Sequence, residues 1–213
     1  MGGWYITTLN YHLQNKFSLY GEAVTRSQHV TGDFFARELK VGINYNFQNK
    51  QSVFIGLGNY KTYSSPGDFK KPLTANENRI WEQFTLVNNI SRIKIEHRYR
   101  IEQRWINRDF YNRFRYRLAA TISLNHMAVT TNTFFISSFD EIFFSNKQPY
   151  FLRNKVYTGL GYRFNKLVTL QTGFTRQFDY RTIDNGSGKN YILTSIIFNT
   201  GNFKKSIHSV NTD

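Results

Sequence analysis

The segment Arg92–Trp105 reads RIKIEHRYRIEQRW, and charged residues occupy every second position along most of it. These charged residues are Lys94, Glu96, Arg98, Arg100, Glu102 and Arg104. The positions between them carry mainly Ile, Tyr and Trp. This alternation predicts a β-strand, because successive side chains of a strand point to opposite faces. One face of the predicted strand is charged and the other is largely apolar.

The same period of two continues along nearly the whole chain of 213 residues. It predicts about eleven strands, at residues 4–13, 17–28, 34–47, 51–62, 79–90, 92–106, 110–124, 133–144, 154–164, 167–178 and 190–199. Most are about twice as long as the ~5–6 residues usual in soluble sheets, and they reach the ~9–11 residues that cross a bilayer at a tilt. No segment has a helical apolar period, so we expect an all-β protein.

The predicted connections alternate in length. Short turns follow the first, third, fifth and ninth strands, whereas longer polar segments lie at 63–78, 145–153 and 179–190. Short turns at one end and long loops at the other are typical of outer-membrane barrels. We therefore predict a transmembrane antiparallel up-and-down β-barrel of 10–12 strands over residues 1–200, with a C-terminal tail at 201–213. Ten and twelve strands are alternatives to the eleven counted from the alternation, because bacterial barrels usually have an even number.

Alternation alone does not say which face is inside. Aromatic residues make up 17% of the chain, and they gather toward the ends of the predicted strands, as interfacial girdles do in membrane barrels. One apolar face, from the third strand, is formed by Phe35, Leu39, Val41, Ile43, Tyr45 and Phe47. A soluble barrel of this width needs a filling such as a central helix. We therefore predict that the apolar face contacts lipid and that the charged face lines a polar, Arg-rich lumen.

The strand at 110–124 adds a second set of basic residues to this lumen, namely Arg113, Arg115 and Arg117. Other strands contribute Glu22, Arg26, Glu38, Lys40 and Arg163 by the same parity. Asp140 and Glu141 are adjacent, so only one can point inward unless a bulge intervenes. We expect glycines such as Gly56 and Gly161 to make room for guanidinium groups. The basic excess leaves two interpretations open, a salt-bridged plug and an anion-accepting channel or pocket.

Motifs for catalysis or cofactor binding are absent from the sequence. There is no cysteine, and no metal-ligand spacing, nucleophile elbow or phosphate loop is present. His97 has the parity of the apolar face, and ion pairing explains Asp140 and Glu141 more simply than acid–base catalysis does. We therefore predict no catalytic residue, no metal and no cofactor, and the sequence favours a non-enzymatic role.

The net charge of +14 would attract polyanions. The partners we expect are outer-membrane lipid and lipopolysaccharide, and other outer-membrane proteins, but not nucleic acid. The predicted function is a structural or partner-binding component of the outer membrane, or a narrow anion-preferring pore. Two alternatives are an enzyme acting at the barrel rim on lipid or peptide, and a soluble barrel that binds an acidic ligand.

Several motifs together resemble a known family. They are RIKIEHRYRIEQRW at 92–105, NRFRYRL at 112–118, IWEQ at 80–83, SFDEIFF at 138–144, GLGYRF at 159–164 and LQTGFTRQF at 170–178. These motifs are similar to those of an uncharacterised outer-membrane β-barrel family of Bacteroidetes-type bacteria, domain of unknown function 2490. The resemblance implies a barrel in the bacterial outer membrane but no reaction. No signal peptide precedes Trp4, so we expect the sequence to represent a mature form.

Overall fold

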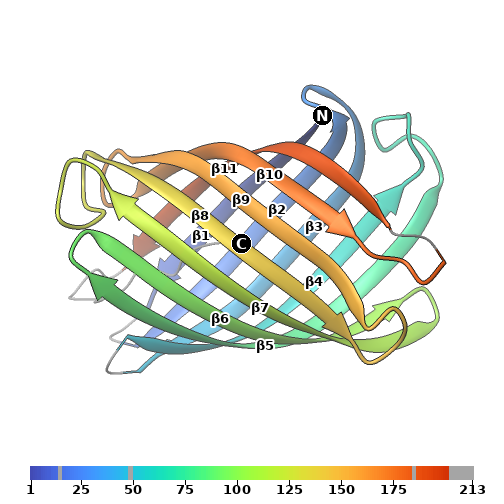
Figure 1. The fold of residues 1–213 in the computed structure, drawn as a ribbon, viewed down its shortest axis with the longest axis horizontal. Coiled ribbons are helices and arrows are strands. Elements are labelled where there is room, and N and C mark those ends of the chain that lie inside the picture. The colour runs from blue at the N-terminus through green and yellow to red at the C-terminus, as the bar shows by residue number, and fades with distance from the viewer. Residues whose placement is uncertain (14–15, 48–49, 184–185, 202–213) are drawn as a thin grey trace.

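The structure is a computed structural model, and it describes residues 1–13, 16–47, 50–183 and 186–201. These residues form eleven strands and contain no helix. The strands are β1 (Gly2–His12), β2 (Phe17–His29), β3 (Gly32–Asn46), β4 (Gln51–Tyr63), β5 (Leu73–Ile90), β6 (Ile93–Ile106), β7 (Asp109–Ser123), β8 (Thr133–Ser145), β9 (Phe151–Arg163), β10 (Val168–Asp179) and β11 (Ser187–Gly201). They wrap around one closed barrel, tilted against its long axis (Figure 1). The predicted all-β barrel is confirmed.

What the structure shows of the predicted C-terminal tail and of a membrane-spanning helix is limited to the residues that it describes. The predicted tail lies outside the described residues except for Gly201, which ends β11. A membrane-spanning helix, one both long and apolar enough to cross a bilayer, is not found in the described part of the chain.

The barrel closes through a parallel pair of strands. Each strand pairs antiparallel with the next in sequence, but β1 pairs with β11 in parallel, with Trp4 opposite Leu193. The expectation of a wholly antiparallel barrel is therefore wrong at this seam. The physical reason is the strand number: with an odd number of alternating strands, the first and the last run in the same direction.

The closure leaves the two ends of the described chain at opposite rims. We call the rim that holds Gly2 the N-terminal rim; its described connecting residues are 30–31, 64–72, 107–108, 146–150, 180–183 and 186. The opposite rim, the C-terminal rim, holds Gly201 and the described connecting residues 13, 16, 47, 50, 91–92, 124–132 and 164–167. Figure 1 shows the N-terminal rim on the right and the arrowhead of β11 on the left.

The loops are shorter than predicted because three strands begin earlier. β5 begins at Leu73, β9 at Phe151 and β11 at Ser187. In β5 the early start is supported by polar side chains, since the Asn59 amide donates to Asn76 at 3.0 Å and to Asn78 at 2.8 Å. The predicted contrast between short-turn and long-loop ends does not hold, because each rim has two-residue turns or short connections as well as one nine-residue loop.

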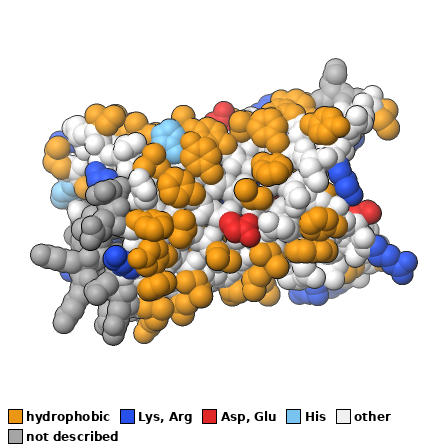
Figure 2. All heavy atoms as spheres, turned by 90° about the horizontal axis from the view of Figure 1, so that it is seen from below, with side chains coloured by type: hydrophobic (Ala, Val, Ile, Leu, Met, Phe, Trp, Pro, Cys, Tyr) orange, Lys and Arg blue, Asp and Glu red, His pale blue; other side chains and the backbone are white. Residues whose placement is uncertain are grey.

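The polarity of the barrel is inverted relative to a soluble protein. Leu39 is 64% exposed on the outer face, whereas Glu102 and Glu141 are both 0% exposed inside. Figure 2 shows hydrophobic side chains spread over one outer face, with Lys and Arg mainly toward the two ends. The predicted Arg-rich lumen is therefore present.

Strand glycines make room for aromatic rings and not for guanidinium groups. A Cβ at Gly56 would overlap the indole of Trp81, and a Cβ at Gly161 would overlap the ring of Phe135. Both rings point into the lumen, where Trp81 stacks on Phe54 with ring centroids 6.0 Å apart. The expectation about these glycines is wrong, because the lumen is lined by large rings as well as by charges.

Candidate functional site

The inward charged residues of β6 and those of β7 form two ladders that lie side by side on neighbouring strands. The β6 ladder is Lys94, Glu96, Arg98, Arg100, Glu102 and Arg104, and the β7 ladder is Arg113, Arg115 and Arg117. In the pairing of β6 with β7, Arg98 lies opposite Arg117 and Arg100 lies opposite Arg115. Like charges directly opposite each other are destabilising. The arrangement therefore needs carboxylates from other positions to stabilise it.

Glu102 supplies the first of these carboxylates. Its Oε2 accepts a hydrogen bond from Nε of Arg113 at 2.7 Å, and its Oε1 accepts one from Nη1 of Arg115 at 2.6 Å. Arg100 Nη1 is more distant, at 3.7 Å from Oε1, and this guanidinium instead donates to the side-chain carbonyl of Gln83 at 2.6 and 2.9 Å. Glu102 thus holds two arginines of β7 in one buried, charge-assisted cluster.

Glu141 supplies the second carboxylate, from β8. Its Oε1 accepts hydrogen bonds from Arg98 at 2.6 Å and from Arg115 at 2.7 Å, and Lys155 Nζ lies 3.4 Å from its Oε2. Arg115 therefore bridges Glu102 and Glu141. The ladders of β6 and β7 and the strands β8 and β9 are joined in one buried ionic network.

Further ion pairs extend this network toward both rims and across the lumen. They are Glu96 with Lys94 and Arg117, Glu77 with Arg79 and Arg104, Glu22 with Lys40, Glu38 with Arg26 and Lys40, and Asp179 with Arg153. All these side chains belong to the inward face of the barrel. Replacement of a fully buried, shared acid such as Glu102 would leave its basic partners uncompensated.

Basic groups outnumber the acids that they share. Among the described residues, twelve basic side chains form lumen ion pairs: Arg26, Lys40, Arg79, Lys94, Arg98, Arg100, Arg104, Arg113, Arg115, Arg117, Arg153 and Lys155. They share seven carboxylates, from Glu22, Glu38, Glu77, Glu96, Glu102, Glu141 and Asp179. Arg163 donates to the backbone oxygens of Val129 and Asn165, each at 3.2 Å. The described lumen therefore carries excess positive charge.

The structure places ten of the eleven predicted lumen residues inside. The exception is Asp140, which is exposed on the outer face and accepts a hydrogen bond from the Asn154 amide at 2.5 Å. The reason is that the only register shift between β8 and β9 lies at Phe143/Phe144, so Asp140 and Glu141 alternate normally. They cannot act together as an acid–base pair on one substrate.

Among the described residues, five charged side chains of the lumen are not predicted by the sequence: Glu77, Arg79, Arg153, Lys155 and Asp179. Arg79 lies on the same face of β5 as Trp81. Because a tryptophan is apolar, its presence on this face hides the alternation that would indicate a charged, inward face. Glu77, Arg153 and Asp179 fall in segments that were predicted to be loops. The parity of Arg163, carried back along β9, would have placed Lys155 and Arg153 inside.

An apolar cluster lies between two cavities of the lumen. Its buried members are Trp4, Ile6, Val24, Phe139, Tyr157, Tyr191 and Leu193. Some of these residues line a cavity of about 90 Å³ toward the C-terminal rim, and others line a cavity of about 60 Å³ toward the N-terminal rim. The cluster and the ionic network together leave little open space at the middle of the barrel.

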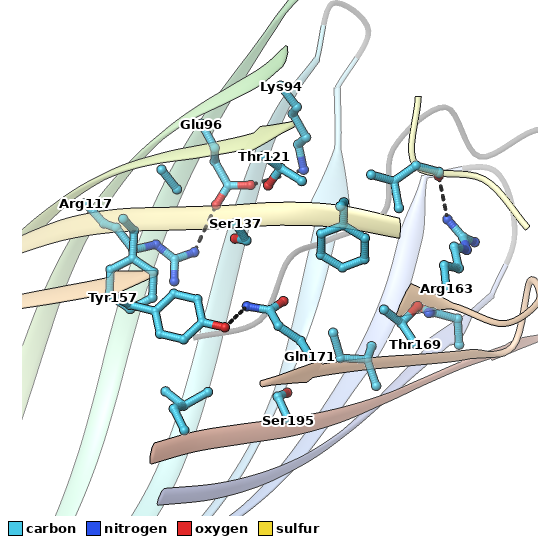
Figure 3. Close-up of a pocket in the computed structure, with 17 residues that line it drawn as sticks. Lys94, Glu96, Arg117, Thr121, Ser137, Tyr157, Arg163, Thr169, Gln171 and Ser195 are labelled. Carbon is cyan, nitrogen blue, oxygen red and sulfur yellow. Dashed lines mark hydrogen bonds and ion pairs between the residues drawn. The ribbon is translucent and has the colours of Figure 1, made fainter. Parts of the chain in front are cut away.

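The cavity toward the C-terminal rim has a mixed polar wall (Figure 3). Gln171 donates to the hydroxyl of Tyr157 at 2.8 Å, and Arg117 donates to Glu96 at 2.9 Å. The hydroxyl of Ser195 is buried here and has no hydrogen-bond partner among the described residues. No group of three or more His, Cys, Asp or Glu in the described part of the chain is placed to hold a metal ion.

Comparison with known proteins identifies the family of the chain. No curated protein and no solved structure matches the chain. A family model described as "Protein of unknown function (DUF2490)" matches residues 1–187. This match covers strands β1 to β10, which carry both charged ladders and most of the apolar cluster. The chain therefore belongs to the family Protein of unknown function (DUF2490).

Proposed function

We propose that the protein is an integral β-barrel of the bacterial outer membrane, with a salt-bridged lumen and a structural or partner-binding role. The observation that carries this proposal is the inverted polarity: large apolar side chains cover the outer face and charged side chains fill the interior. Extensive exposed apolar surface is rare on soluble monomers. A closed barrel also satisfies its backbone hydrogen bonds in hydrocarbon, because it has no free edge.

The filled lumen favours a structural role over that of a wide pore. The buried ionic network joins β5 to β9, and the apolar cluster lies beside it. The two cavities, of about 90 and 60 Å³, are small. Porins, in contrast, enclose a water-filled channel. The barrel is thus suited to hold its outer surface and its rims in a fixed arrangement.

Lipid and lipopolysaccharide are the proposed surroundings. Exposed basic side chains at the N-terminal rim include Lys70, Lys71, Arg108 and Lys147. They could pair with phosphate groups of lipopolysaccharide, while the apolar belt contacts acyl chains.

The outer face also favours a protein partner. Asp140 and Glu82 point outward, and Glu82 accepts a hydrogen bond from Gln103 at 3.1 Å. A charged group facing lipid is unfavourable at mid-membrane depth, and a second membrane protein could cover it. A photo-crosslinker at Ser138, beside Asp140, should yield a protein adduct in cells, whereas one at Ile55 should yield lipid adducts only. Lipid adducts alone at both positions would contradict this partner face.

Tryptophan fluorescence tests the membrane proposal. Trp105 is 42% exposed on the outer face, whereas Trp4 and Trp81 are buried in the lumen. In vesicles whose lipids carry bromine near the headgroup end of the acyl chain, we expect strong quenching of the wild type and little quenching of Trp105→Phe. Equal quenching of the tryptophan fluorescence of both proteins would contradict the placement of Trp105 in the lipid-facing outer surface. A protein that stays monodisperse without detergent and ignores vesicles would instead support a soluble barrel.

A further inference from the structure

The cavity toward the N-terminal rim has an unusual lining. Its volume is about 60 Å³. Seven basic side chains line it, namely Arg26, Lys40, Arg79, Arg113, Arg115, Arg153 and Lys155. Only two carboxylates share this lining, Glu22 and Glu38. The space is therefore surrounded by positive charge.

Acids behind the wall do not balance this charge. The carboxylates paired with the lining bases are Glu22, Glu38, Glu77, Glu102, Glu141 and Asp179. Three of these six also bind bases outside the lining, because Glu77 pairs with Arg104, Glu102 with Arg100, and Glu141 with Arg98. In this part of the described lumen, ten basic groups share six acids.

Several guanidinium groups keep donors for a further acceptor. Arg79 gives Nε and Nη2 to Glu77, Arg113 gives Nε and Nη2 to Glu102, and Arg153 gives Nε to Asp179. A guanidinium carries five N–H donors. Among the described residues, the buried Nε of Arg26 has no hydrogen-bond partner. The contacts of Arg79, Arg113 and Arg153 with their carboxylates use Nε or Nη2, which leaves Nη1 of each for a further acceptor.

The basic groups converge from several sides of the lumen. Arg26 comes from β2, Arg79 from β5, Arg113 from β7 and Arg153 from β9. Arg113 lies within electrostatic reach of Arg79, and Arg153 within reach of Arg26. Repulsion between such buried like charges is strong because little water screens it. An anion at the centre would relieve it from every side.

We infer that this cavity binds a free tetrahedral oxyanion of the inorganic phosphate class. A cavity volume of about 10–15 Å³ holds one water molecule. The cavity of about 60 Å³ therefore has room for a small ion but not for a lipid headgroup with its glycerol. Donors from opposite walls suit a tetrahedral ion better than a planar carboxylate, which presents its oxygens at one end. The site goes beyond the proposed function, since it depends on the closed barrel and not on the membrane that surrounds it.

Calorimetric titration of the detergent-folded protein with inorganic phosphate tests this site, at constant ionic strength set with chloride. We expect saturable binding by the wild type. Arg153→Gln and Arg79→Gln should bind about tenfold more weakly or worse, because each removes one charge-assisted donor set. Both are tolerable changes: Asp179 is partly exposed, and Glu77 keeps Arg104. Arg163→Gln, at the other cavity, should bind phosphate as the wild type does.

Loss of phosphate binding can be distinguished from loss of folding and from failure to insert into a membrane. Circular dichroism and heat-modifiable gel migration establish that each variant is a folded barrel, and Arg153→Lys provides a milder second variant. Absence of binding by the folded wild type, or equal loss in Arg163→Gln, would overturn the site. Equally tight binding of acetate would overturn the tetrahedral assignment, and equally tight binding of glycerol 3-phosphate would overturn the free ion. Failure to insert into vesicles would refute only the membrane proposal.

Discussion

Asp140 and Glu141 are neighbours in sequence, yet their carboxylates occupy opposite faces of β8. Glu141 lies in the ionic network with Arg98, Arg115 and Lys155, whereas Asp140 contacts Asn154 on the outer face. The two residues therefore form a natural matched pair, in which the same chemical change can be made inside and outside the barrel.

Glu141→Leu should strongly destabilise the barrel. It leaves two arginines and Lys155 with fewer acids, and breaking a buried ion pair costs about 3–5 kcal/mol. Asp140→Leu should be neutral or stabilising in a bilayer, because it removes a charge from the outer face. Urea unfolding in phosphatidylcholine vesicles measures both changes. Similar unfolding midpoints for the two variants would show that the network contributes little to stability.

Gly56→Ala should destabilise the fold by overpacking. The added methyl group would overlap the Trp81 ring, which is 1% exposed and cannot move into open space. Overpacking of this kind costs about 1–3 kcal/mol. Gly21→Ala is the control, since a Cβ at Gly21 meets nothing within 4 Å. Unfolding free energies compare them, and an unaffected Gly56→Ala variant would mean that the Trp81 ring lies elsewhere.

The two rims should be accessible from opposite sides of a membrane. The chain has no cysteine, so Thr31→Cys at the N-terminal rim and Ser91→Cys at the C-terminal rim are single, specific probes. A membrane-impermeant maleimide applied to intact cells should label only one of them, and lysis should expose the other. Labelling of both on intact cells would be incompatible with a barrel that spans the bilayer.

A narrow pore, if open, should prefer anions. The described lumen ion pairs comprise more basic than acidic side chains, and such an excess favours anion entry. We expect small conductance in planar bilayers, with a reversal potential that indicates anion preference. Tyr157→Ala should raise the conductance, because Tyr157 belongs to the cluster between the two cavities. Cation selectivity would rule out an anion-preferring pore. If neither the wild type nor Tyr157→Ala conducts, only the structural role is supported.

Much of the barrel could be predicted from the sequence, because alternation is a local property. The ladder from Lys94 to Arg104 shows a strand and its charged face directly. The start of β5 could not be predicted in this way, since Asn76 and Asn78 place polar side chains on the outer face. Their hydrogen bonds to Asn59 on β4 make the segment a strand, and only the fold reveals that partner.

The ion-pair partners of the lumen residues could not be predicted from the local alternation either. Parity places Glu102 and Arg115 inside, but it does not say that Arg115 also reaches Glu141 on another strand. Closure was unpredictable for a related reason. The direction of the pairing between β1 and β11 depends on the parity of the total strand number, so one miscounted strand reverses the answer.

The parallel seam sets a condition on how the protein is made. The Asn10 side chain donates to Asn199 at 3.1 Å, across 189 residues of sequence. Until β11 arrives, β1 presents an unpaired edge, and such edges are templates for aggregation. Closing a loop of this length is also entropically costly. Assembly therefore cannot finish one hairpin at a time from the first strand onward: the earliest strand to emerge must be kept from wrong partners until the last one has been delivered.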